Sequence, residues 1–133
     1  MAKTFLSAGD TFVVANSGSE LVGGTGTETI EIESGVTDLT LDGNIEKVEL
    51  DNLAAADVEL RVNDSNQLEL VSGGQVVASF SGGLNSAVDV VFSDGNATLS
   101  QTGVASYGLA DPNDSSDSVT IDPSTPQGGH AVT

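Results

Sequence analysis

The chain has 133 residues, which is enough for one domain and at most two. It carries 3 Lys and Arg against 20 Asp and Glu, so its formal net charge is −17. Three cations cannot form the basic patch that phosphate binding needs, so we expect neither nucleic acid nor an anionic membrane surface as a partner. There is no Cys and no apolar run long enough for a transmembrane helix. We also expect no N-terminal signal peptide, because no basic segment followed by an apolar run opens the sequence.

The composition favours an all-β fold. Val, Thr, Ser and Gly dominate, with 16 Gly in the chain, and these residues favour strands and turns over helices. Aliphatic residues are frequent enough to bury a core, so the acidity does not indicate a disordered chain. Aromatic residues make up only 4% of the sequence. We therefore expect a thin aliphatic core, as in a sandwich or a solenoid.

An apolar–polar–apolar triplet recurs every nine or ten residues through the middle of the chain. In a strand, the outer residues of a triplet share one face and the middle residue points to the other, so the pattern predicts short strands with one buried face. The triplets are Ile30–Ile32, Leu39–Leu41, Val48–Leu50, Val58–Leu60 and Leu68–Leu70. We expect the outer residues to be buried and the middle ones to be exposed, namely Glu31, Thr40, Glu49, Glu59 and Glu69.

Turn-forming residues separate the predicted strands. Gly73-Gly74 and Asp94-Gly95 each lie between two apolar segments, which predicts two hairpins, and Ala54–Ala56 indicates a short helical turn. Strands spaced in this way are typical of a β-sandwich, so we expect an all-β sandwich of short strands. The same spacing fits successive faces of a β-solenoid, which is the alternative for the N-terminal half, over residues 20–62.

Three segments of the chain differ in composition. Residues 13–110 hold most of the predicted strands and are expected to form one β domain. Residues 1–12 are expected to form an N-terminal arm. Residues 111–133 are expected to form an extended acidic arm, rich in Pro and Gly, with one short strand at Val119–Ile121. Apolar anchors of the first arm are expected to make assembly contacts; they are Phe5, Leu6 and Phe12.

The segment Gly23–Glu31 resembles the nonapeptide G-G-x-G-x-D-x-U-x of calcium-binding RTX β-rolls, with Glu28 where that family has Asp. The resemblance implies a Ca²⁺ ion held between the glycine-rich turns of adjacent coils. The wider stretch Thr11–Ala110 is similar to a module of secreted RTX-associated bacterial proteins and of phage virion proteins, cyanophages among them. Its hallmarks are ETIEIESGVTDLTLDGNIEKVEL, NDSNQLELVSGGQVVASF and VVFSDGNATLS. This resemblance implies a surface-exposed structural role and provides no active-site residues.

A second calcium candidate lies near the C-terminus. Oxygen-bearing side chains alternate there at positions 1, 3, 5 and 7 of a loop pattern, with a further carboxylate at position 12. The residues are Asp111, Asn113, Ser115, Asp117 and Asp122. Catalytic patterns are missing: His130 is the only His, and neither a nucleophile elbow nor a phosphate-binding loop occurs. We therefore expect no enzyme and no cofactor other than Ca²⁺.

Two functions are compatible with these features. The first is a non-enzymatic structural protein, a cement or decoration subunit on the virion surface of a phage. Its expected partners are further copies of the chain, with a trimer as the assumed homo-oligomer, and a major capsid or scaffold protein. The alternative is a secreted, RTX-like matrix or adhesive module that binds calcium and reaches the extracellular space without an N-terminal signal peptide.

Overall fold

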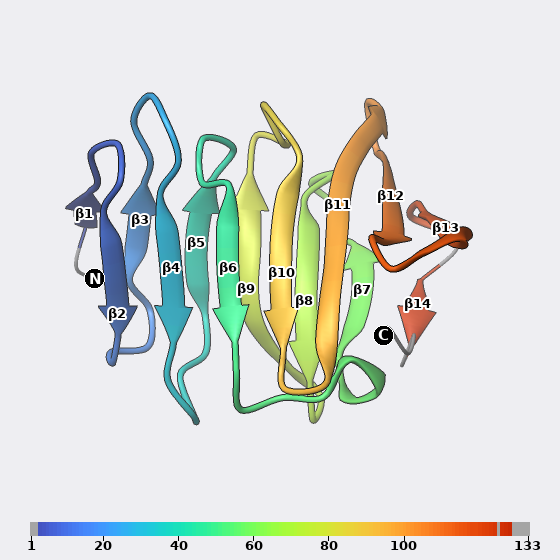
Figure 1. Cartoon of the computed structure of the whole chain (residues 1–133), viewed down its shortest axis with the longest axis horizontal. Coiled ribbons are helices and arrows are strands. Elements are labelled where there is room, and N and C mark those ends of the chain that lie inside the picture. Colours follow the sequence, from blue (N-terminus) through green and yellow to red (C-terminus); the bar gives the residue numbers. More distant parts are fainter. Residues whose placement is uncertain (1–2, 125, 129–133) are drawn as a thin grey trace.

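The computed structural model describes the backbone of residues 3–124 and 126–128, and their side chains except those of residues 115, 117, 127 and 128. Strands make up 54% of the described residues and form two seven-stranded sheets that pack face to face (Figure 1). The expected all-β sandwich is therefore confirmed. Within the described residues the one helical element is a 3-10 turn, η1 (Ala55–Asp57), where the sequence indicates a helical turn. None of the helical structure found in these residues is long and apolar enough to cross a membrane.

The first six strands of the chain alternate between the two sheets. The first sheet has the order β1 (Lys3–Phe5), β3 (Glu20–Val22), β5 (Leu39–Asp42), β9 (Gln75–Ser81), β8 (Leu68–Ser72), β7 (Glu59–Val62) and β14 (Gln127–Gly128). The second has the order β2 (Thr11–Val14), β4 (Thr29–Ile32), β6 (Lys47–Leu50), β10 (Val88–Phe92), β11 (Gly95–Gly103), β12 (Ser106–Asp111) and β13 (Asp114–Ile121).

The first six strands form a parallel roll, in which each coil gives one strand to each sheet. The coils are β1 with β2, β3 with β4, and β5 with β6, and each strand pairs in parallel with its equivalent in the next coil. A fourth coil, β9 with β10, pairs in parallel with the third. Phe12, Ile30, Val48 and Val90 thus occupy the same register position on successive coils. Each coil has two strands, one on each side of the core, so one apolar triplet is expected for every half coil.

The rest of the chain is antiparallel. The two predicted hairpins are confirmed: β8 pairs with β9 around Gly73-Gly74, and β10 pairs with β11 around Asp94-Gly95. β7 and β8 are inserted between the third and fourth coils and extend the first sheet, while β11, β12 and β13 extend the second. In Figure 1 the first three coils of the roll, coloured blue to green, lie at the left, and the strands that extend the two sheets lie at the right.

The core lies between the sheets, and all ten outer residues of the triplets are buried in it, as expected. The five middle residues face outward but are half-buried, so the prediction that they are exposed was wrong in degree. The reason is the register: the outward residues of neighbouring strands lie side by side and shield one another, as Glu31 and Glu49 do across β4 and β6.

The limits of the solenoid alternative also need correction. The roll begins at β1 rather than at residue 20, and β7 is not part of it because it pairs antiparallel with β8. The segment predicted as an N-terminal arm supplies β1 and the start of β2, so residues 3–12 are a coil of the roll. The predicted strand at Val119–Ile121 is the end of the longer β13, while residues 125 and 129–133 of the predicted C-terminal arm lie outside the described residues.

Candidate functional site

The turns along one side of the molecule form a row. They join the two strands of each coil and comprise residues 6–10, 23–28, 43–46 and 82–87, all at the top of Figure 1. Hydrogen bonds connect successive turns: Gly9 N donates to Thr27 O at 2.8 Å, and Asn85 N donates to Gly43 O at 3.0 Å. We call this set of turns the turn row. It is the part of the molecule that corresponds to the RTX-like nonapeptide.

Three carboxylate residues stack in the turn row, at equivalent positions of three successive coils. Asp10, Glu28 and Glu46 each precede a strand, and the strand residues that follow them are paired in register. The backbone confirms the stacking, because Thr29 N donates to Asp10 O at 2.9 Å and Lys47 N donates to Glu28 O at 3.2 Å. We call these three residues the acid column.

Glu28, in the middle of the acid column, is fully buried, with 0% of its surface exposed. Neither of its carboxylate oxygens has a hydrogen-bond partner. A Cβ on Gly23 would lie 2.7 Å from both Glu28 Oε1 and the carbonyl oxygen of Asn44, so the side chain occupies space that only a glycine leaves free. A carboxylate in such a place is unstable as an unpaired anion, and it needs either a proton or a cation.

The electrostatic surroundings of Glu28 act in the same direction. Burial raises the pKa of Glu28, and the Glu46 carboxylate raises it further, with smaller contributions from Asp42 and Asp10. The Gly24 backbone amide lowers the pKa, although its N–H does not reach hydrogen-bonding geometry. Glu46 is held close because its Oε1 accepts a hydrogen bond from Glu28 N at 3.2 Å.

The donor set around Glu28 fits a hard cation in kind. Carboxylate oxygens and backbone carbonyls are the ligands that Ca²⁺ prefers, and the orphaned Glu28 oxygens lie beside the Asn44 carbonyl. Within the described residues, no three Asp, Glu or His side chains converge closely enough to form a complete metal site by themselves. Glu28 and the Asn44 carbonyl are therefore the groups that would hold a Ca²⁺ ion here.

The second calcium candidate has a different environment. Asp111 ends β12 and is buried, with 3% exposed, while Asn113 is exposed in the turn that follows; Asn113 N donates to Asp111 Oδ1 at 2.8 Å. From residue 114 onward the chain is strand β13 rather than a loop. Asp117 lies on that strand, and its side chain is outside the described set. The backbone thus departs from a calcium-binding loop after its first three positions.

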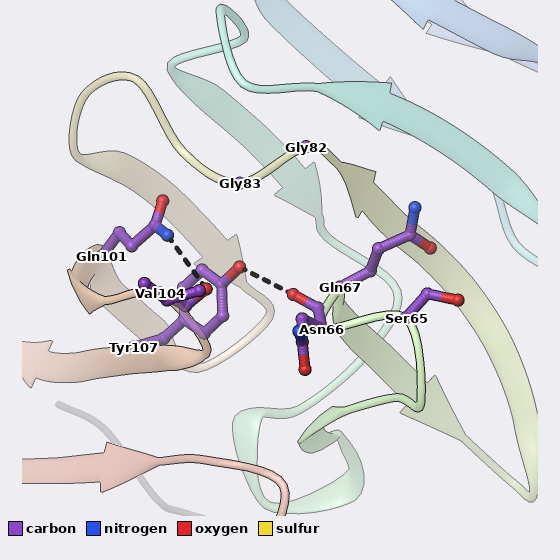
Figure 2. A pocket seen from close by; sticks show the side chains of 8 residues that line it. All are labelled: Ser65, Asn66, Gln67, Gly82, Gly83, Gln101, Val104 and Tyr107. Atoms are coloured by element: carbon purple, nitrogen blue, oxygen red, sulfur yellow. Dashed lines mark hydrogen bonds between the residues drawn. The ribbon is translucent and has the colours of Figure 1, made fainter.

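A pocket of about 370 Å³ lies where the β7–β8 turn, the β9–β10 turn and the β11–β12 hairpin meet (Figure 2). Its lining carries hydroxyl and amide groups but no carboxylate, imidazole or amine, so Ser65 has no general base within the lining. The residues are Ser65, Asn66, Gln67, Gly82, Gly83, Gln101, Val104 and Tyr107.

Several polar groups that line this pocket already have hydrogen-bond partners within the chain. Tyr107 is fully buried, and its hydroxyl donates to Asn66 O at 3.3 Å. Gln101 Oε1 accepts from Leu84 N at 2.9 Å, and Gln101 Nε2 donates to Gly103 O at 2.9 Å. In Figure 2 the side chains of Ser65 and Gln67 point away from Gln101 and Tyr107. The pocket thus lies at a polar contact between the turn row and the antiparallel strands.

The free end of the roll is the third feature. β1 and β2 are the outermost strands of the two sheets at this end, at the left of Figure 1. Phe5 on β1 is 71% exposed and Val13 on β2 is 46% exposed. The only other large hydrophobic residue that is exposed in the described part of the chain is Val104, in the turn after β11.

The structure separates the three predicted assembly residues. Phe5 points outward, with Lys3 Nζ 5.4 Å from the centre of its ring. Leu6 is 7% exposed and belongs to the core, and Phe12 is half-buried against the same core at the end of the roll. Phe5 is therefore available to a partner, whereas Leu6 and Phe12 are used within the chain.

Sequence reasoning identified Glu28 but missed its neighbours in the acid column. Asp10, Glu28 and Glu46 are spaced by one coil each, so the repeat itself carried the signal. The exposure of Val13 was missed because the sequence does not show which face of β2 packs on the core; the pairing of β2 with β4 decides this. Comparisons of the chain with protein-family models, with curated proteins and with solved structures found no match.

Proposed function

We propose that this chain is a non-enzymatic structural protein, a cement or decoration subunit on the surface of a phage particle. The observation that carries the proposal is the free end of the roll, where two edge strands expose Phe5 and Val13. Unpaired edge strands with exposed apolar residues are surfaces that another chain can extend. The protein's function would then depend on its surfaces, with a major capsid or scaffold protein as the second partner.

The distribution of charge supports the same proposal. The chain has a net charge of −17, and such a charge keeps an assembled particle soluble and opposes non-specific association. The pocket lacks a general base, so its hydroxyl groups have no partner for nucleophilic chemistry.

The test is the location of the protein in its native source. Particles purified from that source are labelled with a gold-conjugated antibody against the chain and viewed by electron microscopy, while mass spectrometry measures its copy number relative to the major capsid protein. The proposal expects regular surface labelling and a fixed stoichiometry. Labelling of extracellular fibres, or of no particle at all, would contradict it. An antibody against an internal capsid protein is the control for particle integrity.

A secreted RTX-like, calcium-binding module is the second candidate, and Glu28 is the observation that favours it. Its buried, unpartnered carboxylate lies in the turn row, near the Asn44 carbonyl and between the other two acids of the acid column, Asp10 and Glu46. A divalent cation there would neutralise the carboxylate and supply the interactions that its oxygens lack.

Calcium binding is tested by thermal unfolding with Ca²⁺ and with chelator. The intact protein is expected to melt at a higher temperature with Ca²⁺, whereas Glu28→Gln should lose this difference. Glu33→Gln, which removes an exposed carboxylate just after β4, is the matched control and should keep it. Mg²⁺ at the same ionic strength controls for screening of the overall charge. Equal shifts for all three proteins would mean screening alone and would exclude a specific site at Glu28.

A further inference from the structure

The two ends of the roll differ in how their edges are covered. At the fourth coil, antiparallel strands continue both sheets, so β9 pairs with β8 and β10 pairs with β11. At the first coil, no strand of the described chain pairs with the outer side of β1 or β2. Stacked coils bury their faces only against neighbours, so an end coil without a cap is an incomplete structure.

The first coil also has the least repulsive surface of the four. The outward residues of its strands are Lys3, Phe5, Thr11 and Val13, and none of them is acidic. Each of the other coils has at least one outward acid on its strands: Glu20 and Glu31 in the second, Asp42 and Glu49 in the third, Asp89 in the fourth. In a chain with a net charge of −17, this end is where two copies can approach with the least like-charge repulsion.

We propose that the first coil binds the first coil of a second copy of this chain, end to end about a two-fold axis, so that both sheets continue across the interface. This inference rests on the proposed role as an assembly subunit and names its partner. Edge strands related by a two-fold axis pair antiparallel. Self-complementary contacts of this kind are the commonest in homo-oligomers.

The sequence of β1 suits such a pairing. With Thr4 opposite the partner's Thr4, the outward Lys3 lies opposite the partner's Phe5, and the same pair forms twice. Lys3 already lies 5.4 Å from the ring centre of its own Phe5, which is a favourable distance for a cation and an aromatic face. The two edges of this end are also similar in length, with 3 residues in β1 and 4 in β2.

The opposite edge of the molecule is a poorer partner. Its outermost strands are β13, with 8 residues, and β14, with 2, so two copies cannot extend both sheets equally there. A contact between the first coil and that edge would also be head to tail, and it would form either a closed ring or an open filament. The two-fold contact closes after two copies, and it replaces the trimer expected at first, because a three-fold arrangement needs two different surfaces per copy.

The test is sedimentation velocity of the purified protein over a range of concentrations, with four chains compared: wild type, Phe5→Asp, Val13→Asp and Val104→Asp. The wild type is expected to convert from one copy to two as concentration rises. Phe5→Asp and Val13→Asp should each raise the dissociation constant by more than about tenfold, because a buried interface aromatic or aliphatic residue contributes strongly and a buried charge opposes association. Val104→Asp adds the same charge at an equally exposed apolar position outside the roll and should dimerise like the wild type.

Each outcome decides the proposal. Circular dichroism establishes first that all four chains are folded, which is expected because the three substituted side chains are exposed. A wild type that stays monomeric, growth into filaments, or equal weakening by all three substitutions would overturn the two-fold contact. The result is independent of the labelling of particles. Dimers without particle labelling would support this contact and contradict the proposed function. Labelled particles without dimers would support the proposed function and contradict this contact.

Discussion

The roll and the antiparallel part of the molecule share the same two sheets but are held together differently. In the first three coils of the roll, from β1 to β6, the buried hydrophobic residues are all aliphatic, and Phe12 covers the core at the free end. The large aromatic residues Phe80, Phe92 and Tyr107 are buried in the fourth coil and in β12. The roll depends on repeated close stacking of coils, whereas the antiparallel part depends on hairpins around a few large side chains.

The difference shows that one apolar repeat can serve two topologies. Alternating short strands bury the same face whether the next strand is parallel or antiparallel, so the connections decide the topology. In the roll, the connections are glycine-containing turns that approach one another closely. In the antiparallel part, they are hairpin turns, which have two residues between β8 and β9 and between β10 and β11. Mutations that affect packing, turn contact and charge should therefore act unequally on the two regions.

The largest effect is expected for Phe80→Ala. Phe80 is fully buried on β9, which pairs with β5 of the roll on one side and β8 of the antiparallel part on the other. Removing the ring should lower the free energy of unfolding by about 3–5 kcal/mol in urea titrations followed by circular dichroism. One cooperative transition is expected, because the strand belongs to both regions. Two separate transitions would show that the roll and the antiparallel part unfold independently. Phe5→Ala, measured on the dilute monomer, is the control for loss of an exposed ring.

The next effect distinguishes the turn row from an ordinary strand. A Cβ on Gly43 would lie 2.5 Å from the backbone oxygen of Gly83, in the next turn of the row, so Gly43→Ala must push two coils apart. We expect a loss of about 1–3 kcal/mol in the free energy of unfolding. Gly108→Ala on β12 is the matched control, because its Cβ would make only ordinary contacts of 3.5 Å, and it should change stability by less than about 0.5 kcal/mol. Similar losses in both variants would show that turn contact does not hold the roll together.

Glu28→Gln should change how stability depends on pH. The folded state raises the pKa of Glu28, because of burial and the Glu46 charge, so folding favours the protonated carboxyl. The stabilising contribution of that proton is complete below the pKa of the unfolded chain and is lost as pH rises through the raised, folded pKa. In calcium-free buffer, Glu28→Gln should therefore gain stability relative to the wild type as pH rises above the ordinary range of a glutamate. Thermal melts across pH measure this difference, and a constant offset between the two proteins would contradict it.

The smallest effect concerns the outer face of the second sheet. Glu31 and Glu49 are direct neighbours in register on β4 and β6, and like charges in this position repel. Glu49→Lys should raise the free energy of unfolding by about 0.2–1 kcal/mol, and added salt should reduce the gain. Glu33→Lys changes the charge by the same amount at an exposed position after β4. An equal gain in that control would mean that net charge, and not the pair, is responsible.

Much of the fold could be predicted from the sequence, because it depends on local patterns. The apolar triplets located the buried faces of five strands, and paired turn residues located two hairpins. The parallel roll was only an alternative, since alternation within a strand does not specify its neighbours. Its start at β1 was missed because β1 and β2 do not repeat the triplet pattern and residues 1–12 were interpreted as an arm. Its fourth coil, β9 with β10, was missed because it follows the inserted strands β7 and β8.

The candidate sites were less predictable, for two physical reasons. A glutamate is ordinarily exposed, so nothing local indicates that Glu28 is fully buried while Glu31, three residues later, faces outward. The burial of Glu28 arises from contacts between turns, because its side chain occupies the space beside Gly23 and near Asn44 in the turn of the third coil. On β2, a shift of one residue would exchange Phe12 and Val13 between core and surface, and only the closed coil decides which one is exposed.

The inserted strands β7 and β8 determine the order in which the chain can fold. Val48 finds its partner Ile30 one coil earlier in the sequence, but Val90, its partner on the other side, follows only after the whole insertion. During synthesis from the N-terminus, three coils can therefore stack while both of their ends are still open, and the fourth coil closes one end only when β9 and β10 have emerged. Long-range parallel pairing of this kind is slow. The order of the strands along the chain thus gives a folding stage in which both ends of the stacked coils have unpaired strand edges.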